Sequence, residues 1–172
     1  MNKNFIPNYL TLGNIFCGFT SILTTIHGYY IWSSVFIFLA MLADRYDGIV
    51  ARKLGVFSDL GKELDSLCDV VSFGVAPAVL VFEKFVTIDK PSISLMVIVA
   101  VICGIFACCG AYRLARFNVT TMKKGFYQGV PITTCGTILA IISLFGLPSI
   151  IMLILTLLGS YLMVSSIKIK KI

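Results

Sequence analysis

Acidic residues are few in this 172-residue chain, and most of them fall in one short segment. Six of the eight lie within 26 consecutive residues: Asp44, Asp47, Asp59, Glu63, Asp65 and Asp69. Carboxylate oxygens are the ligands that Mg²⁺ and Mn²⁺ prefer, and paired carboxylates suit two-metal sites that stabilise the attacking and leaving oxygens of phosphoryl transfer. The segment therefore predicts a metal-dependent site for phosphoryl chemistry.

The spacing of four aspartates makes this prediction more specific. Asp44 and Asp47 are three residues apart, and Asp65 and Asp69 are four apart, so each pair occupies one face of a helix. Two such faces can oppose each other, and we expect the four carboxylates to hold two divalent cations, Mg²⁺ or Mn²⁺. In the alternative interpretation, nearby basic residues pair with these acids at a solvated surface: Arg45, Arg52 and Lys53.

The elements that carry these acids are predicted to be membrane helices. Hydrophobic residues make up 58% of the chain and charged residues only 13%, far below the ~25% typical of soluble domains. The apolar runs predict six transmembrane helices, over residues 8–27, 31–53, 60–82, 92–116, 129–146 and 149–167. At ~20 residues per span no separate soluble domain fits, so residues 1–172 are predicted to form one all-α, membrane-embedded domain. Pro77 either bends the third span or only packs within it.

Counting along the predicted spans places the two acidic pairs at one depth. Asp44 lies 13 residues after Ile31, and Phe82 lies 13 residues after Asp69, so both pairs lie ~20 Å from the outer end of their helices. An aspartate costs roughly 2.5–3.5 kcal/mol at the membrane midplane and less at this depth. Bound cations would compensate that cost.

The basic residues predict the orientation. Lys84 and Lys90 fall on one side of the predicted bundle, and the other twelve fall on the opposite side: Lys3, Arg45, Arg52, Lys53, Lys62, Arg113, Arg116, Lys123, Lys124, Lys168, Lys170 and Lys171. Because loops rich in Lys and Arg stay in the cytoplasm, both termini and the acidic pairs are predicted to face it, in a multi-pass protein of the cell membrane. The net charge of +6 could suggest a nucleic-acid partner. However, the basic residues lie between apolar runs and do not form the clustered, water-exposed basic face that nucleic-acid binding needs.

The six cysteines all lie in apolar stretches without metal-finger spacing: Cys17, Cys68, Cys103, Cys108, Cys109 and Cys135. They are predicted to be small buried thiols, neither a disulfide framework nor a zinc site.

The acidic segment resembles the signature of the CDP-alcohol phosphotransferases, D-x-x-D-G-x-x-A-R-x8-G-x-x-x-D-x-x-x-D. All eight fixed positions match: Asp44, Asp47, Gly48, Ala51, Arg52, Gly61, Asp65 and Asp69. The resemblance implies a six-helix membrane enzyme, usually a homodimer, in which a hydroxyl acceptor displaces CMP from a CDP-linked lipid or alcohol. It also implies that the four aspartates hold the two metal ions and that Asp69 is the general base.

Further residues are candidates for binding the CDP-lipid. Gly48, Ala51 and Gly61 would let the nucleotide approach the helix backbone, although small residues also serve close helix packing. Arg52 would pair with phosphate or anchor the helix at the membrane interface. Asn8 and Thr11 would line the nucleotide pocket or belong to an ordinary helix start.

Segments outside the signature resemble the integral-membrane phosphatidylserine synthases of this family: residues 66–78, residues 112–118 and Gly129-Val130-Pro131. This resemblance implies L-serine as the acceptor and a CDP-diacylglycerol or an archaeal CDP-lipid as the donor. Because the serine carboxylate needs a cationic partner, Arg113 and Arg116, together with Asn118, are predicted to bind serine. The alternative is that the arginines add positive charge to the inner side or bind lipid phosphate.

Two other functions stay open at this point. A related enzyme could use glycerol 3-phosphate or an inositol phosphate as its acceptor. A small divalent-cation transporter could use the acids as permeation ligands, but ion passage does not require the Gly-Ala-Arg elements of the signature.

Overall fold

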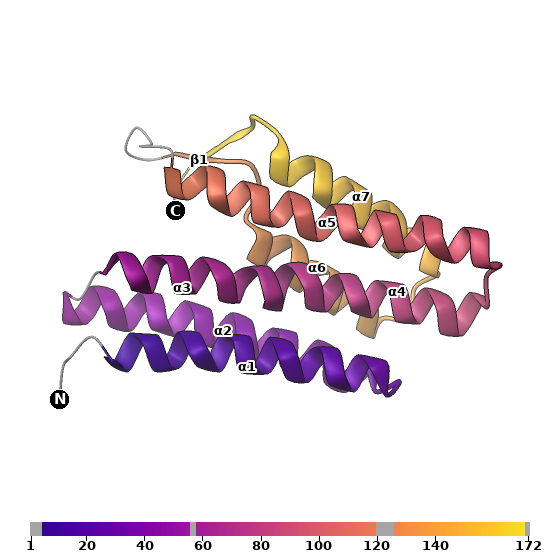
Figure 1. The fold of residues 1–172 in the computed structure, drawn as a ribbon, viewed down its shortest axis with the longest axis horizontal. Helices are drawn as coiled ribbons and strands as arrows, with labels where there is room; N and C mark the ends of the chain where they lie inside the picture. The colour runs from indigo at the N-terminus through magenta and orange to yellow at the C-terminus, as the bar shows by residue number, and fades with distance from the viewer. Residues whose placement is uncertain (1–4, 56–57, 120–125, 171–172) are drawn as a thin grey trace.

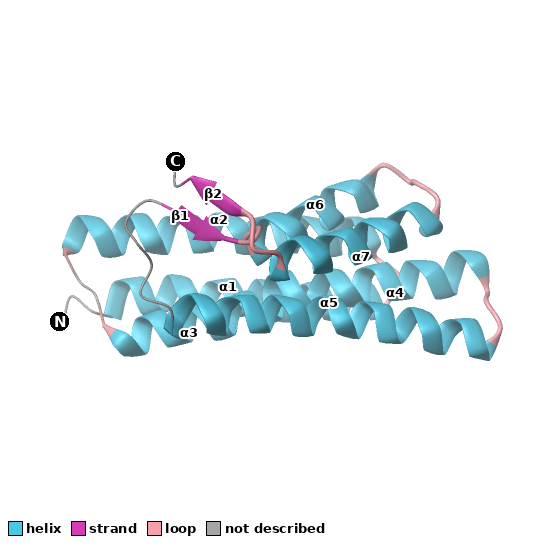
Figure 2. Cartoon of the chain, turned by 90° about the horizontal axis from the view of Figure 1, so that it is seen from above, coloured by secondary structure: helices cyan, strands magenta, loops and turns pink. Residues whose placement is uncertain are grey.

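The computed structural model describes residues 5–55, 58–119 and 126–170, and these form an elongated helical bundle (Figure 1). The helices are α1 (Phe5–Ile26), α2 (Tyr30–Leu54), α3 (Asp59–Asp69), the π-helical segment η1 (Val70–Val75), α4 (Ala76–Asp89), α5 (Ile93–Val119), α6 (Ile132–Leu144) and α7 (Ser149–Val164). Two short strands, β1 (Phe126–Gln128) and β2 (Lys168–Lys170), pair antiparallel at one end of the bundle (Figure 2). The sequence did not predict this small sheet.

Within the described residues, three helical stretches are long and apolar enough to cross a membrane: Asn8–Ile26, Asp59–Asp89 and Ile93–Val119. α2 has 25 residues but carries several charges in its second half, and α6 and α7 are apolar but have only 13 and 16 residues. Large apolar side chains such as Phe16, Val97 and Ile154 are exposed, as they are when lipid is the solvent. The chain is therefore a multi-pass membrane protein, and six spans remain a prediction.

The helices run up and down the bundle, with their connections at its two ends. The start of α1, the end of α2, the start of α3, the end of α5 and strand β2 lie at one end, and the α1–α2, α4–α5 and α6–α7 turns lie at the other (Figure 1; Figure 2). Gly28 (φ 80°) and Gly146 (φ 62°) adopt the left-handed conformation in the first and last of these turns. Of the basic residues used to predict orientation, Lys3, Lys123, Lys124 and Lys171 lie outside the described residues.

One continuous helix of 31 residues, Asp59–Asp89, forms the centre of the bundle and contains η1. The segment η1 contacts α1, α4, α5 and α6. Pro77 follows it, buried near the start of α4, and the N–H of Ala76 donates to the Val71 carbonyl five residues earlier. Because proline has no N–H and its ring crowds the preceding turn, a wider π-helical turn just before it accommodates the break. The sequence left open whether Pro77 bends this helix or only packs within it, and it did not predict the π-helical turn.

Two glycines allow neighbouring helices to pack directly on η1. A Cβ atom at Gly18 of α1 would lie 2.8 Å from Cα of Ser72, and one at Gly136 of α6 would lie 2.8 Å from Cα of Phe73. Any side chain at either position would push α1 or α6 away from the central helix. These contacts set how closely α1 and α6 pack on η1, the segment that directly follows Asp69.

The cysteines largely match the prediction of buried thiols, and one lysine is buried in the bundle. All six cysteines are free; Cys68, Cys103 and Cys135 are buried, but Cys108 is exposed on α5, so the prediction of a buried thiol is wrong there. Cys108 is exposed on an apolar helix, where a lipid-facing thiol is tolerated. Lys84 is buried and its Nζ donates to the carbonyl of Ser143 at 2.6 Å, near the C-terminal end of α6, where a cation is favourable.

Candidate active site

Three of the predicted carboxylates converge. Asp44 and Asp47 of α2 and Asp65 of α3 each offer one oxygen, and these three oxygens lie within 4.8 Å of one another. We call these three residues the acidic cluster. Asp47 is buried, and Asp44 and Asp65 are partly buried. Like charges at this distance and burial repel strongly, so the arrangement favours a bound cation.

The fourth aspartate, Asp69, is not one of the three that converge. It is the last residue of α3, it is only 6% exposed, and its Oδ1 accepts a hydrogen bond from Nδ2 of Asn14 at 3.2 Å. One turn earlier on α1, the hydroxyl of Thr11 donates to Oδ2 of Asp47 at 2.7 Å. Helix α1 packs against both α2 and α3, so it positions one carboxylate on each of them.

The chemistry of the acidic cluster fits a divalent metal ion. Oδ1 of Asp65 is buried and has no hydrogen-bond partner among the described residues. Of the basic neighbours named in the alternative interpretation, the exposed Arg52 donates its Nε to the carbonyl of Gly48 at 2.9 Å. The three carboxylates, including this Asp65 oxygen, form an all-oxygen donor set of the kind that Mg²⁺ and Mn²⁺ prefer.

The small residues of the signature have different surroundings. A Cβ atom at Gly48 would meet no atom within 4 Å, so close helix packing does not explain this glycine, and the space beside Asp47 is open to a ligand. At Gly61 a Cβ atom would lie 3.0 Å from Oγ of Ser58, which caps α3 by accepting from the Gly61 N–H, and 3.4 Å from Oδ1 of Asn8. Ala51 is partly buried on α2, one turn beyond Asp47.

The residues predicted to bind serine have structural contacts. Arg113 is 6% exposed, and its guanidinium lies 5.5 Å from the ring centre of Phe117. Arg116 donates to the carbonyls of Val164 and Ser165 at the end of α7, at 3.1 and 3.4 Å. Asn118 donates to Oγ of Ser66 at 2.9 Å and so joins α5 to α3. Contact with serine stays a prediction for all three.

Sequence reasoning missed two groups of residues near the acidic cluster. The first is Asn14, which is fully buried and bonded to Asp69; a single Asn in an apolar helix gave only a weak signal. The second is a pocket of ≈ 350 Å³ between α2 and α6, which we call the threonine pocket. Its polar lining consists of Asp44, Arg45, Thr133, Thr134 and Thr137. Three threonines within five residues of an apolar run were the available signal.

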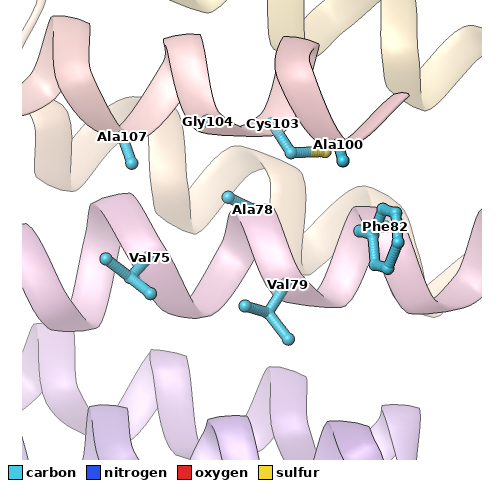
Figure 3. Close-up of a pocket in the computed structure, with 8 residues that line it drawn as sticks. All are labelled: Val75, Ala78, Val79, Phe82, Ala100, Cys103, Gly104 and Ala107. Atoms are coloured by element: carbon cyan, nitrogen blue, oxygen red, sulfur yellow. The ribbon is translucent and has the colours of Figure 1, made fainter. Parts of the chain in front are cut away.

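A second pocket, of ≈ 240 Å³, has a different character. It lies between α5 and the helix formed by η1 and α4, and its lining side chains are small or apolar (Figure 3). Val75, Ala78 and Phe82 line one side, and Ala100 and Ala107 line the other. Because the lining carries no carboxylate or basic group, this pocket cannot perform phosphoryl chemistry.

The fold and site together define a multi-pass membrane protein with a carboxylate cluster suited to divalent ions. The family described as CDP-alcohol phosphatidyltransferase matches residues 4–164. The chain therefore belongs to the CDP-alcohol phosphatidyltransferase family, as the signature predicted.

Similar proteins include two that are named CDP-diacylglycerol--serine O-phosphatidyltransferase. The Bacillus subtilis protein is 38% identical over 166 residues, which cover 96% of this chain and 89% of the relative. The Methanocaldococcus jannaschii protein is 41% identical over 166 residues, covering 96% and 74%. The archaetidylserine synthase of Methanothermobacter thermautotrophicus is 36% identical over 166 residues, covering 95% and 68%.

Proposed function

We propose that this protein is an enzyme that transfers the phosphatidyl group of a CDP-lipid to the hydroxyl of L-serine, forming phosphatidylserine or its archaeal ether counterpart and releasing CMP. The observation that carries the proposal is the convergence of Asp44, Asp47 and Asp65 in a chain of this family. The names of the relatives support serine as the acceptor. Two of these names specify CDP-diacylglycerol as the donor, and the third, archaetidylserine synthase, indicates an archaeal lipid.

In the proposed reaction, the serine oxygen forms a bond to the lipid-side phosphorus while the bond from that phosphorus to the CMP oxygen breaks. Two divalent ions, Mg²⁺ or Mn²⁺, held by Asp44, Asp47, Asp65 and Asp69, would neutralise the diphosphate and stabilise the departing CMP. Asp69 accepts the proton of the serine hydroxyl. Because Oδ1 of Asp69 is engaged with Asn14, its Oδ2 is the atom proposed to take the proton.

The CDP-lipid is proposed to lie along the signature face of α2. Open space at Gly48 supports close approach of the nucleotide to this helix, and Ala51 and Gly61 would extend the same surface. Arg52 would bind a phosphate, with Asn8 and Thr11 on the α1 side. Thr11 also orients Asp47 through its hydrogen bond, so it would act on the metal ligands as well as on the nucleotide.

The membrane arrangement completes the proposal. Six spans, with both termini and the acidic cluster facing the cytoplasm of the cell membrane, would leave the lipid tails in the bilayer and the nucleotide in water. The positive-inside pattern of the basic residues supports this orientation. A homodimer is proposed on the family resemblance, and cross-linking of the purified protein in native membranes would test it.

The deciding experiment is product identification with the purified, full-length chain. Isotope-labelled L-serine, CDP-diacylglycerol and Mg²⁺ or Mn²⁺ are supplied, and lipids and CMP are measured by mass spectrometry. We expect labelled phosphatidylserine and an equal amount of CMP, with both lost on chelation by EDTA and restored by added metal. Parallel assays replace serine by glycerol 3-phosphate or by inositol phosphate. CMP release with either of these, but not with serine, would overturn the serine assignment.

A further inference from the structure

The threonine pocket shares Asp44 with the acidic cluster. Its lining combines this carboxylate and Arg45, from α2, with the hydroxyls of Thr133, Thr134 and Thr137, from α6. A molecule in this pocket would therefore reach the edge of the proposed metal centre. The lining also offers one negative group, one positive group and several neutral donors, which matches a small zwitterion better than an acyl chain.

The hydroxyl of Thr137 is unusual for a buried threonine of this protein. Thr137 is 7% exposed, and its Oγ1 has no hydrogen-bond partner among the described residues. In contrast, the buried hydroxyls of Thr25 and Thr156 donate to the carbonyl four residues earlier in their helices, at 2.9 and 2.7 Å. A buried hydroxyl without a partner costs roughly 1–3 kcal/mol. A hydroxyl that lines a pocket and lacks even this local bond is suited to a ligand.

The beginning of α6 adds a site for a negative charge. The helix has 13 residues, and its N-cap residue, Pro131, makes no side-chain hydrogen bond to the first turn. Thr133 and Thr134 belong to that first turn, and Thr137 follows one turn later on the same face. The N–H groups at a helix start favour an anion such as a carboxylate, and the exposed Arg45 lies across the pocket on α2.

We propose that the threonine pocket is the binding site for the acceptor amino acid. The first turn of α6 and Arg45 hold its carboxylate, the hydroxyl of Thr137 donates to or accepts from its polar groups, and its own hydroxyl faces Asp44. This inference rests on the proposed function, because it takes serine as the acceptor. It places the acceptor between α2 and α6, on residues outside the family signature and apart from Arg113 and Arg116.

The test is a steady-state analysis of Thr137→Val, which removes the hydroxyl and keeps the shape of the side chain. We expect the KM for serine to rise about tenfold, the KM for the CDP-lipid to stay unchanged, and the thermal stability to stay equal or increase, because no hydrogen bond of the fold is lost. Thr137→Ser, which keeps the hydroxyl, is expected to restore the wild-type KM. Thr134→Val is expected to raise the serine KM in the same way.

The matched control is Thr156→Val, since Thr156 is a buried threonine of α7 whose hydroxyl donates to the Met152 carbonyl of the same helix. Its serine KM should equal that of the wild type. An unchanged serine KM in Thr137→Val and Thr134→Val would overturn the inference. So would a rise in the CDP-lipid KM alone, which would assign the pocket to the lipid headgroup, or a serine KM that responds only to Arg113→Ala. The wild-type assay distinguishes failure of this inference from failure of the proposed function, because a wild-type protein that does not use serine contradicts the proposed function itself.

Discussion

In the part of the chain that the structure describes, few polar side chains contact the acidic cluster and Asp69. Thr11 and Asn14 are neutral donors, and each gives one hydrogen bond to one carboxylate. Oδ1 of Asp65 receives none from the described residues. A buried carboxylate without a partner lowers the stability of the folded protein, so these side chains are retained at a cost that a bound cation would remove.

Replacing Asp65 by Asn separates function from stability. The change removes a negative charge from the acidic cluster and keeps the shape of the side chain. We expect CMP release by Asp65→Asn to fall by about 10²–10³-fold or more, because metal binding weakens. The melting temperature without metal should not fall, because like-charge repulsion is relieved. Asp69→Asn should lose activity to a similar extent, because the proposed base is removed.

The matched control for both variants is Asp59→Asn, an exposed acid in the first turn of the same helix and outside the signature. It should retain wild-type turnover. Wild-type CMP release from Asp65→Asn or Asp69→Asn, measured beside this control, would contradict the assigned roles.

Asn14 is expected to position Asp69, to which it is hydrogen-bonded. Its side chain is fully buried, Nδ2 bonds Asp69, and Oδ1 has no partner among the described residues. Asn14→Ala should lower kcat about tenfold, because Asp69 loses the hydrogen bond that orients it, while the KM values for both substrates stay near those of the wild type. Thr20→Ala, also on α1, serves as the control, because the Thr20 hydroxyl donates to the Phe16 carbonyl of the same helix. A variant whose kcat stays unchanged would exclude the positioning role.

At the scale of the helices, the central helix and its π-helical turn set the position of the carboxylates. The main chain of Asn14 is held directly, since the hydroxyl of Ser72 in η1 donates to its carbonyl at 3.0 Å. One turn further along α1, Gly18 lies against Ser72. The helix that orients Asp47 and Asp69 is thus attached to the segment that immediately follows Asp69.

This attachment predicts a contrast between two glycines of α1. Gly18→Ala should destabilise the fold by about 1–3 kcal/mol and lower turnover, because the added methyl group meets the backbone of Ser72 and moves α1. Gly13→Ala adds the same methyl group where no atom lies within 4 Å, and it should be neutral or up to about 1 kcal/mol stabilising. Thermal unfolding in detergent and CMP release measure both effects. Equal behaviour of the two variants would show that the Gly18 contact does not position α1.

The sequence predicted the features that depend on local spacing. Helix periodicity placed Asp44, Asp47 and Asp65 on facing surfaces. Apolar runs placed the helix bounds within three residues, except that the third helix continues to Asp89 instead of ending at residue 82. Features that depend on contacts between distant residues were not predicted. The π-helical turn depends on Pro77 together with packing from α1 and α6, and the bond between Arg116 and Val164 joins residues 48 positions apart. Neither the π-helical turn nor this hydrogen bond produces a pattern in the local sequence from which it could be predicted.

At the scale of the whole molecule, the open question is whether α6 and α7 cross the bilayer. At ~1.5 Å per residue, their 13 and 16 residues span ~20 and ~24 Å, less than a hydrocarbon core of ~30 Å. Short helices can still cross if the bilayer thins around them. Two observations favour crossing: the α6–α7 turn lies at the same end of the bundle as the α1–α2 turn, and Lys84 ties α4 to the end of α6.

We therefore expect Leu147→Cys, in the α6–α7 turn, to react with a membrane-impermeant maleimide added outside intact cells, as Tyr29→Cys in the α1–α2 turn should. Leu54→Cys, at the other end of α2, should react only after the membrane is permeabilised, and the wild type measures the background from the native thiols. All three positions are at least partly exposed. Labelling of Leu147→Cys only after permeabilisation would mean that α6 and α7 enter and leave the membrane on the cytoplasmic side. The bundle would then have four complete spans, and the acidic cluster would face a re-entrant hairpin.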